Sequence, residues 1–96
     1  MKILALEVEQ PGASAADFVP HLQVEARAVW DLTQAGTIRE VYFRSDRSLA
    51  VMILEAADTQ QAEAILGDLP LVKAGLIRFE VIGLQPYPGF GRLFKG

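Results

Sequence analysis

The sequence of 96 residues contains no cysteine and only one histidine, His21. Without cysteine the chain has no disulfide, no thiolate nucleophile and no cysteine-rich zinc or iron–sulfur site. With a single histidine, a metal ion would have to be held mostly by carboxylates, so we expect no protein-bound metal. No apolar run approaches the roughly 18 residues that are needed to cross a bilayer. The first ten residues also lack the pattern of a signal peptide.

Positive charge is sparse and scattered. The chain has nine Lys and Arg and a net charge of −3. Binding to nucleic acid requires a basic stripe, so we expect no such partner. The motifs that cradle phosphates or dinucleotides, and those of serine and zinc hydrolases, are also absent. We therefore expect a cytoplasmic protein with no membrane partner, whose chemistry comes from a few polar residues in an apolar pocket.

Apolar residues make up 51% of the chain and follow strand-like and helix-like patterns. Alternation with period two predicts strands at residues 2–9, 37–44, 48–56 and 76–84. Helical spacing predicts a helix from residue 15 or 18 to residue 35 and another from 58 to 67. The order βαββαβ predicts one ferredoxin-like α+β domain over residues 1–96, with a four-stranded antiparallel sheet and both helices on one face.

The start of the first helix has two interpretations. Ser14 and Asp17 form a capping-box pattern, which places Pro20 deep enough in the helix to lose a hydrogen bond. If Asp17 is the N-cap instead, Pro20 falls in the first turn, where its missing N–H costs nothing. We prefer the start at Asp17, or a kinked version of the start at Ser14.

The third and fourth predicted strands are apolar on both faces. In the third strand the residues alternate as Leu49, Val51 and Ile53 on one side and Ala50, Met52 and Leu54 on the other. Two helices cover only one face, and an exposed second face would alternate with polar residues. We therefore expect a second copy of the chain to cover it, as a two-fold dimer of sheets. Chance hydrophobicity on an exposed face is the alternative.

Residues 85–96 form a proline- and glycine-rich arm that cannot continue as a central strand. Its large apolar side chains need a surface to cover; they are Tyr87, Phe90, Leu93 and Phe94. We expect this arm to pack at the dimer interface or to close the mouth of a cavity there. A tail folded back over its own helix is the alternative.

Glu25 is the leading candidate for chemistry because it borders the sheet-facing stripe of the first helix. His21 lies one turn earlier, near enough to share a hydrogen bond. A carboxylate in apolar surroundings has a raised pKa and can serve as both base and acid, which moving a proton between two carbons requires. An exposed Glu25 paired with Arg27, and a His21 without a role, are the alternatives.

The remaining candidates would contact a bound small molecule. Arg39 and Arg44 lie in the second predicted strand, where an arginine beside a pocket holds a carboxylate through two parallel hydrogen bonds. Charges of this kind also keep an edge strand unpaired. Tyr42, Trp30 and Tyr87 are aromatic candidates for the same pocket, although packing in the core or at an interface is the alternative for Trp30.

Several segments give nearly the whole chain a resemblance to a known family. These are Glu25, Gly36-Thr37-Ile38-Arg39, Leu69-Pro70-Leu71, Phe79-Glu80-Val81, and Gly83-Leu84 with Pro88. With them the chain resembles the muconolactone delta-isomerases and their uncharacterised relatives, within the dimeric α+β barrel superfamily.

The resemblance implies subunits whose sheets face each other and a pocket between sheet and helices. It also implies cofactor-free migration of a double bond in an unsaturated lactone, with Glu25 as proton carrier and Arg39 as a carboxylate or enolate stabiliser. The isomerases proper carry histidines where this chain has Arg47 and Tyr87. Two alternatives are therefore kept, a cofactor-free monooxygenase or decarboxylase for an aromatic or quinone-like substrate, and a non-catalytic binding or assembly module.

Overall fold

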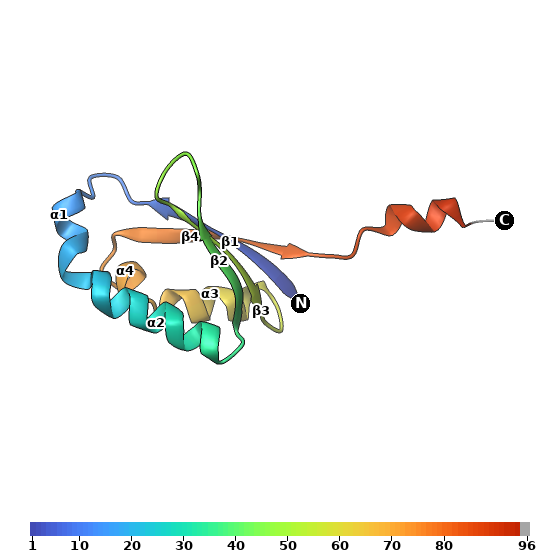
Figure 1. Ribbon diagram of the computed structural model, residues 1–96, viewed down its shortest axis with the longest axis horizontal. Coiled ribbons are helices and arrows are strands. Elements are labelled where there is room, and N and C mark those ends of the chain that lie inside the picture. Colours follow the sequence, from blue (N-terminus) through green and yellow to red (C-terminus); the bar gives the residue numbers. More distant parts are fainter. Residues whose placement is uncertain (95–96) are drawn as a thin grey trace.

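The computed structural model describes residues 1–94 and contains one four-stranded antiparallel sheet with helices on one face (Figure 1). The strands lie in the order β2-β3-β1-β4. Their bounds are β1 Lys2–Glu9, β2 Ile38–Phe43, β3 Ala50–Glu55 and β4 Ile77–Leu84. The long helices are α2, Leu22–Gln34, and α3, Thr59–Gly67. This arrangement confirms the expected ferredoxin-like α+β fold.

The chain enters α2 through a kink. Ser14 caps the short helix α1, Ala15–Phe18, and both its backbone N–H and its hydroxyl donate to the Asp17 carboxylate at 3.0 Å. A 3₁₀ turn follows at Val19–His21, with Pro20 near its start. Because the missing N–H of Pro20 falls in this tighter turn, no bond inside α2 is lost. The preferred start at Asp17 was wrong, and the kinked version of the Ser14 start is confirmed.

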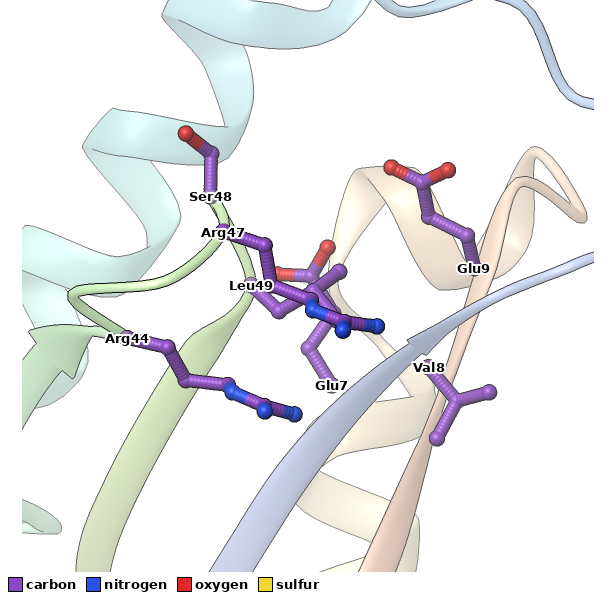
Figure 2. A pocket seen from close by; sticks show the side chains of 7 residues that line it. All are labelled: Glu7, Val8, Glu9, Arg44, Arg47, Ser48 and Leu49. Carbon is purple, nitrogen blue, oxygen red and sulfur yellow. The ribbon is translucent and has the colours of Figure 1, made fainter.

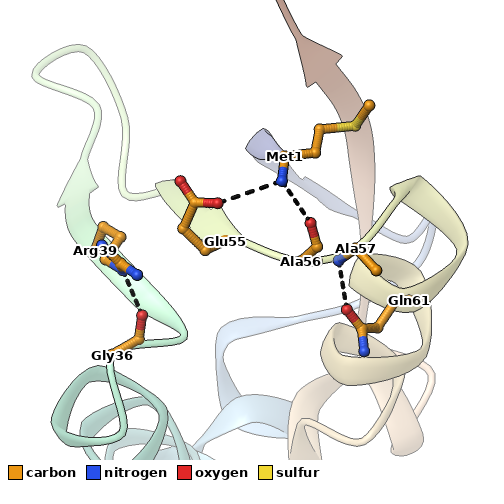
Figure 3. Close-up of polar contacts among 7 residues, drawn as sticks. All are labelled: Met1, Gly36, Arg39, Glu55, Ala56, Ala57 and Gln61. Atoms are coloured by element: carbon orange, nitrogen blue, oxygen red, sulfur yellow. Dashed lines mark hydrogen bonds and ion pairs between the residues drawn. The ribbon is translucent and has the colours of Figure 1, made fainter.

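The second of the two predicted helices is α3, and it starts from an N-cap at residue 58 as predicted. The side chain of this N-cap residue, Asp58, accepts a hydrogen bond from the Gln61 N–H at 2.8 Å. The Gln61 amide oxygen accepts from the Ala57 N–H, one residue earlier than a standard capping box (Figure 3). The chain then forms the short helix α4, Pro70–Lys73, where we had expected only a connection. None of the helices in residues 1–94 is both long and apolar enough to span a bilayer.

The core lies between the sheet and α3, with contributions from the end of α2. Its fully buried large side chains are Ile3, Ile38, Met52, Leu54, Leu66, Leu69 and Ile77. Burial of each such side chain contributes about 1.5–3 kcal/mol to folding. By contrast, α2 contains no fully buried residue. The side of α2 that faces the sheet therefore borders a cavity rather than a filled core.

The sheet face away from the helices is uncovered by any element within residues 1–94 (Figure 1). Register places an apolar row on this face. Its members are Leu4, Leu6, Val8, Val51, Ile53, Ile82 and Leu84. Polar side chains share the face at the edge strands and beside the row, at Lys2, Glu40, Arg78 and Glu80. The second face is therefore apolar at its centre and polar at its margins.

The segment after Leu84 projects away from the domain as an extended arm (Figure 1). A 3₁₀ turn at Pro88–Leu93 follows Tyr87, whose ring packs edge-on against Phe90 with centroids 5.0 Å apart. Phe94 is 83% exposed. The radius of gyration is 15.8 Å, against about 12.5 Å for a compact chain of this length. The arm does not fold back over its own helix. Residues 95–96 of the expected arm lie outside the described residues.

Candidate functional site

An apolar cavity of about 460 Å³ lies between α2 and the sheet. This volume falls in the range of small-molecule sites, about 300–1,000 Å³. The walls are mostly apolar and come from Leu22, Ala26, Val29, Trp30, Val41, Phe43, Ala50, Met52, Leu71 and Phe79, with Glu7, Glu25 and Thr33 as the polar members. The space exists because small side chains, Ala26 on α2 and Ala50 on β3, stand where larger ones would fill it.

Glu25 lies in the first turn of α2 and lines this cavity, as the sequence predicted. The Leu71 N–H donates to Glu25 Oε1 at 2.9 Å. Leu71 is the second residue of α4, and its N–H is one of the groups that a helix start leaves without an intrahelical partner. Burial raises the pKa of Glu25, and the hydrogen bond from Leu71 opposes this only in part.

Glu7 is a second carboxylate in the cavity, and the sequence analysis did not single it out. It follows Ile3 and Ala5 in the helix-facing row of β1, where an apolar residue is expected, and that position was the available signal. The Ala50 N–H donates to Glu7 Oε1 at 3.0 Å. Burial raises the pKa of Glu7, the hydrogen bond from Ala50 opposes this in part, and the charges of Glu9 and Glu25 raise the pKa further.

The two glutamates give the cavity an acid–base pair in otherwise apolar walls. Each carboxyl group has one oxygen, Oε1, bound by a backbone N–H, which leaves Oε2 for another partner. The Thr33 hydroxyl is already engaged, because it donates to the Val29 carbonyl at 2.8 Å. Paired carboxyl groups whose pKa values are raised by burial are typical of sites that transfer protons near neutral pH.

Trp30 lies at the rim of the cavity and is 57% exposed. With Leu22 and Phe43 it forms an apolar mouth. His21 ends the 3₁₀ turn before α2 and is not among the lining residues. Within residues 1–94 Glu25 bonds to Leu71 rather than to His21, so the expected hydrogen bond between the two candidates is not formed.

Arg39 and Tyr42 lie outside the cavity. Arg39 occupies a β-bulge at the start of β2, and its Nε donates to the Gly36 carbonyl (Figure 3). Tyr42 lies on the uncovered face of the sheet, opposite Val51 in the register, and its hydroxyl donates to Glu40 at 2.8 Å.

Arg44 lines a separate polar pocket between the β2–β3 hairpin and the end of β1 (Figure 2). Its guanidinium donates to both oxygens of Asp46, at 2.9 and 2.7 Å, and holds the pKa of Asp46 below its usual range. Arg47, Glu9 and Glu7 also line this pocket. Glu7 therefore lies between the polar pocket and the apolar cavity.

Tyr87 precedes the 3₁₀ turn of the projecting arm and is not among the residues that line the cavity. Of the seven residues predicted to form a site, the structure brings Glu25 and Trp30 to the cavity. The other five, His21, Arg39, Tyr42, Arg44 and Tyr87, are distributed over the turn before α2, the sheet, the hairpin and the arm.

Fold and cavity together define a ferredoxin-like α+β domain with two carboxyl groups in an apolar pocket. The solved structures that share this fold include two enzymes. Muconolactone isomerase has a TM-score of 0.74 and 19% identity, covering 92% of each chain. The 5-chloro-2-hydroxyhydroquinone dehydrochlorinase of Burkholderia phenoliruptrix, in complex with 2,5-dihydroxybenzoquinone, has a TM-score of 0.71 and 18% identity, covering 88% of this chain and 94% of its own.

No protein-family model and no curated protein sequence matches the chain. At 18–19% identity the likeness to the two solved structures concerns the fold. The predicted resemblance to muconolactone isomerase is confirmed at that level.

The raised pKa values of Glu7 and Glu25 predict a pH-dependent cost in stability. Below the ordinary glutamate pKa both groups are protonated in the folded and unfolded chain. As the pH rises through the raised values, the folded state must bury charge, so this part of the stability is lost. Glu7→Gln and Glu25→Gln should therefore match the wild type in unfolding temperature at about pH 4 and exceed it at about pH 7.

Thermal unfolding at the two pH values measures this difference directly. Glutamine keeps a carbonyl oxygen for the Ala50 or Leu71 N–H, so the hydrogen bond is preserved. Glu63→Gln on the exposed side of α3 is the matched control, and its difference from the wild type should not change with pH. A constant difference for the two cavity variants would show that burial does not raise these pKa values.

Proposed function

We propose that this protein acts in the cytoplasm as a homodimeric small-molecule enzyme that moves a proton within an unsaturated lactone or a related organic acid, without a cofactor. Glu25 is the proton carrier. One observation carries the proposal: a half-buried carboxylate with a raised pKa lines an apolar cavity of ligand size. Such a group is poised to act as base and then as acid near neutral pH.

The reaction is a proton shift between two carbons. The Glu25 carboxylate removes a proton from the saturated carbon at the far end of the conjugated system, and the C–H bonding pair becomes a new C=C bond of a dienolate. Negative charge then lies on the former carbonyl oxygen. Glu25 returns its proton to the carbon beside the carbonyl, the carbonyl re-forms, and the double bond has moved. Atoms and electrons balance without an oxidant or reductant.

The two structural neighbours support the choice of substrate class. One is named for the isomerisation of muconolactone, and the other was solved with 2,5-dihydroxybenzoquinone. Both molecules are small, oxygenated, unsaturated rings, and rings of that kind are compatible with a cavity of about 460 Å³. In an unsaturated lactone, a hydrogen on the saturated carbon at the far end of the conjugated system is acidic enough for a carboxylate base in a dry site.

The alternatives receive less support from the site. Trp30, Tyr42 and His21 lining one cavity would support a monooxygenase, but of these only Trp30 lines it. A fully exposed Glu25, together with a space between the sheets filled by side chains, would support a non-catalytic module, whereas Glu25 is half-buried with a bonded carboxyl group. Proton transfer by Glu25 is therefore the function that we carry forward.

The test is turnover of muconolactone by the purified protein in the presence of a chelator and without added cofactor. Ultraviolet absorbance follows the migration of the double bond. We expect a rate above that of buffer, saturable in muconolactone. A folded protein with no turnover of this lactone or of chemically related lactones would remove the isomerase proposal.

We also propose that the uncovered sheet face forms the homodimer interface. Its apolar centre pairs Leu4 on β1 with Ile53 on β3 and with Ile82 on β4, while Glu80 lies opposite Leu6 at its margin. Stable interfaces bury about 800 Å² on each partner, an area comparable to one face of a four-stranded sheet. The arm would then contact the partner, because its apolar side chains find no surface on their own domain.

Removal of the arm after Gln85 should weaken the dimer at least about tenfold, since three exposed aromatic rings and one leucine side chain lose their partner surface. Light scattering over a dilution series measures the dissociation. Arg92→Ala is the control, because it changes the charge of the arm and keeps its aromatic residues. An unchanged dissociation constant in the truncated protein would show that the arm has no role in assembly.

A further inference from the structure

We propose that Glu7 is the second acid of this cavity: it keeps its proton while Glu25 works as the base, and it donates that proton in a hydrogen bond to the oxygen on which negative charge develops. This assignment rests on the proton-transfer function proposed above and adds the group that stabilises the dienolate. Arg39 was expected in that role, but it lies at a bulge outside the cavity.

The two carboxyl groups reach the cavity from opposite walls, Glu7 from the sheet and Glu25 from α2. A ligand in the cavity therefore lies between them. The Ala50 N–H binds Glu7 Oε1 as an acceptor, so the proton of a neutral Glu7 belongs on Oε2. That O–H is the donor available to a ligand oxygen.

The end of the β1–β3 pairing explains why a carboxyl group is tolerated here. The pairing stops at Leu6 and Val51, and the next pair in register would be Glu7 with Ala50. The Glu7 side chain instead takes the Ala50 N–H itself. The strands separate beyond this point, and the polar pocket opens between β1 and the hairpin (Figure 2).

The charged groups around Glu7 favour its neutral form. Glu9 on the same strand and Glu25 on α2 both raise its pKa, in addition to burial. Arg44 and Arg47 line the polar pocket beside it, but Asp46 pairs with both, at 2.7 and 3.7 Å. On β4 the residue in register with Glu7 is the apolar Phe79.

The roles divide because the two carboxyl groups share one site. Burial raises the pKa of both, and a backbone N–H lowers each in part; only for Glu7 do neighbouring carboxylates, Glu9 and Glu25, act in the same direction as burial. We therefore assign the first proton to be released to Glu25, which becomes the base, and the retained proton to Glu7. A neutral carboxylic acid in an apolar site donates a strong hydrogen bond to an enolate oxygen, and preorganised donors of this kind accelerate such reactions by about 100- to 1,000-fold.

A titration without substrate is the first test. Carboxyl carbon NMR of glutamate-labelled protein follows both groups in the wild type, in Glu7→Gln and in Glu25→Gln. We expect Glu7 to titrate at higher pH than Glu25 and to titrate at lower pH in Glu25→Gln, whereas Glu25 should titrate nearly unchanged in Glu7→Gln because Glu7 is still neutral when Glu25 ionises. Independent titration, or Glu25 above Glu7, would overturn the assignment and leave the proposed base in place.

Binding of 4-nitrophenolate is the second test, because its oxyanion imitates the dienolate. The measurement uses the Glu25→Gln background, whose amide imitates the protonated base. Adding Glu7→Met removes the donor and should weaken binding about tenfold to 100-fold, whereas adding Glu7→Gln keeps an N–H donor and the acceptor for Ala50 and should cost less than about tenfold.

Comparison of Glu7→Gln with Glu7→Met separates a role of Glu7 as hydrogen-bond donor from a structural role. Equal binding in all variants, or no binding in any of them, would overturn the role of Glu7. Failure of muconolactone turnover is a distinct result, since it removes the proposed substrate while titration and phenolate binding still decide the assignment of Glu7.

Discussion

Replacement of Glu25 by glutamine should lower the rate of proton transfer at least about 100-fold, the loss expected for a general base, while the fold is kept. The amide cannot accept a proton from carbon at neutral pH. Its oxygen can still accept the Leu71 N–H that now binds Glu25 Oε1 at 2.9 Å. The link between α2 and α4 is therefore preserved, and the loss will report chemistry rather than unfolding.

Steady-state rates of muconolactone isomerisation, measured beside circular dichroism and unfolding temperature, test this expectation. Glu63→Gln removes an exposed carboxylate from α3 and should leave the rate unchanged. In the wild type the rate should fall as the pH drops through the raised pKa of Glu25, because protonation removes the base. Full activity in Glu25→Gln would assign the proton transfer to another group.

A lysine at Leu6 should separate the dimer, weakening association at least about 100-fold. Leu6 lies in the apolar row of the uncovered face, opposite Val51 on β3 and Glu80 on β4. In a sheet-to-sheet dimer the change would remove two leucine side chains from the interface and place two lysines there, and the nearby Glu80 would not offset the desolvation of the lysine in full. Burial of each leucine side chain contributes about 1.5–3 kcal/mol, and about 1.4 kcal/mol corresponds to a factor of ten in affinity.

Sedimentation over a range of concentrations gives the dissociation constants of the wild type and of Leu6→Lys. The matched control is Ala64→Lys, which adds the same charge on the exposed side of α3. We expect the control to stay dimeric and Leu6→Lys to become a monomer that retains its secondary structure. A wild-type protein that is already monomeric, or a Leu6→Lys protein that stays dimeric, would contradict the proposed interface.

The fold was predictable because several local signals agreed. The same order of elements is favoured by the alternating strands, by Asp58 as a helix N-cap, and by Gly36, which ends the first predicted helix. The sequence favoured the wrong start for the first helix, since it did not show that a 3₁₀ turn would absorb Pro20. The helix α4 was missed because it consists of four residues and carries no periodic signal.

The site was predictable only in part. Glu25 was found because helical spacing shows which residues border the sheet. Which side chains of β2 face the cavity was harder to predict, because the bulge between Ile38 and Glu40 shifts the alternation along the strand. Glu7 was passed over as the polar end of a strand, and its importance depends on where the β1–β3 pairing stops, which strand periodicity does not reveal.

The most direct test of the account is proton NMR of muconolactone in D₂O with the wild-type protein and no cofactor. The central claim is that Glu25 removes a carbon-bound hydrogen of a small unsaturated molecule inside the apolar cavity. We predict that carbon-bound hydrogens of the lactone migrate or exchange with deuterium faster than in buffer, and that Glu25→Gln abolishes this. Unchanged carbon-bound signals in the presence of folded wild-type protein would contradict the claim.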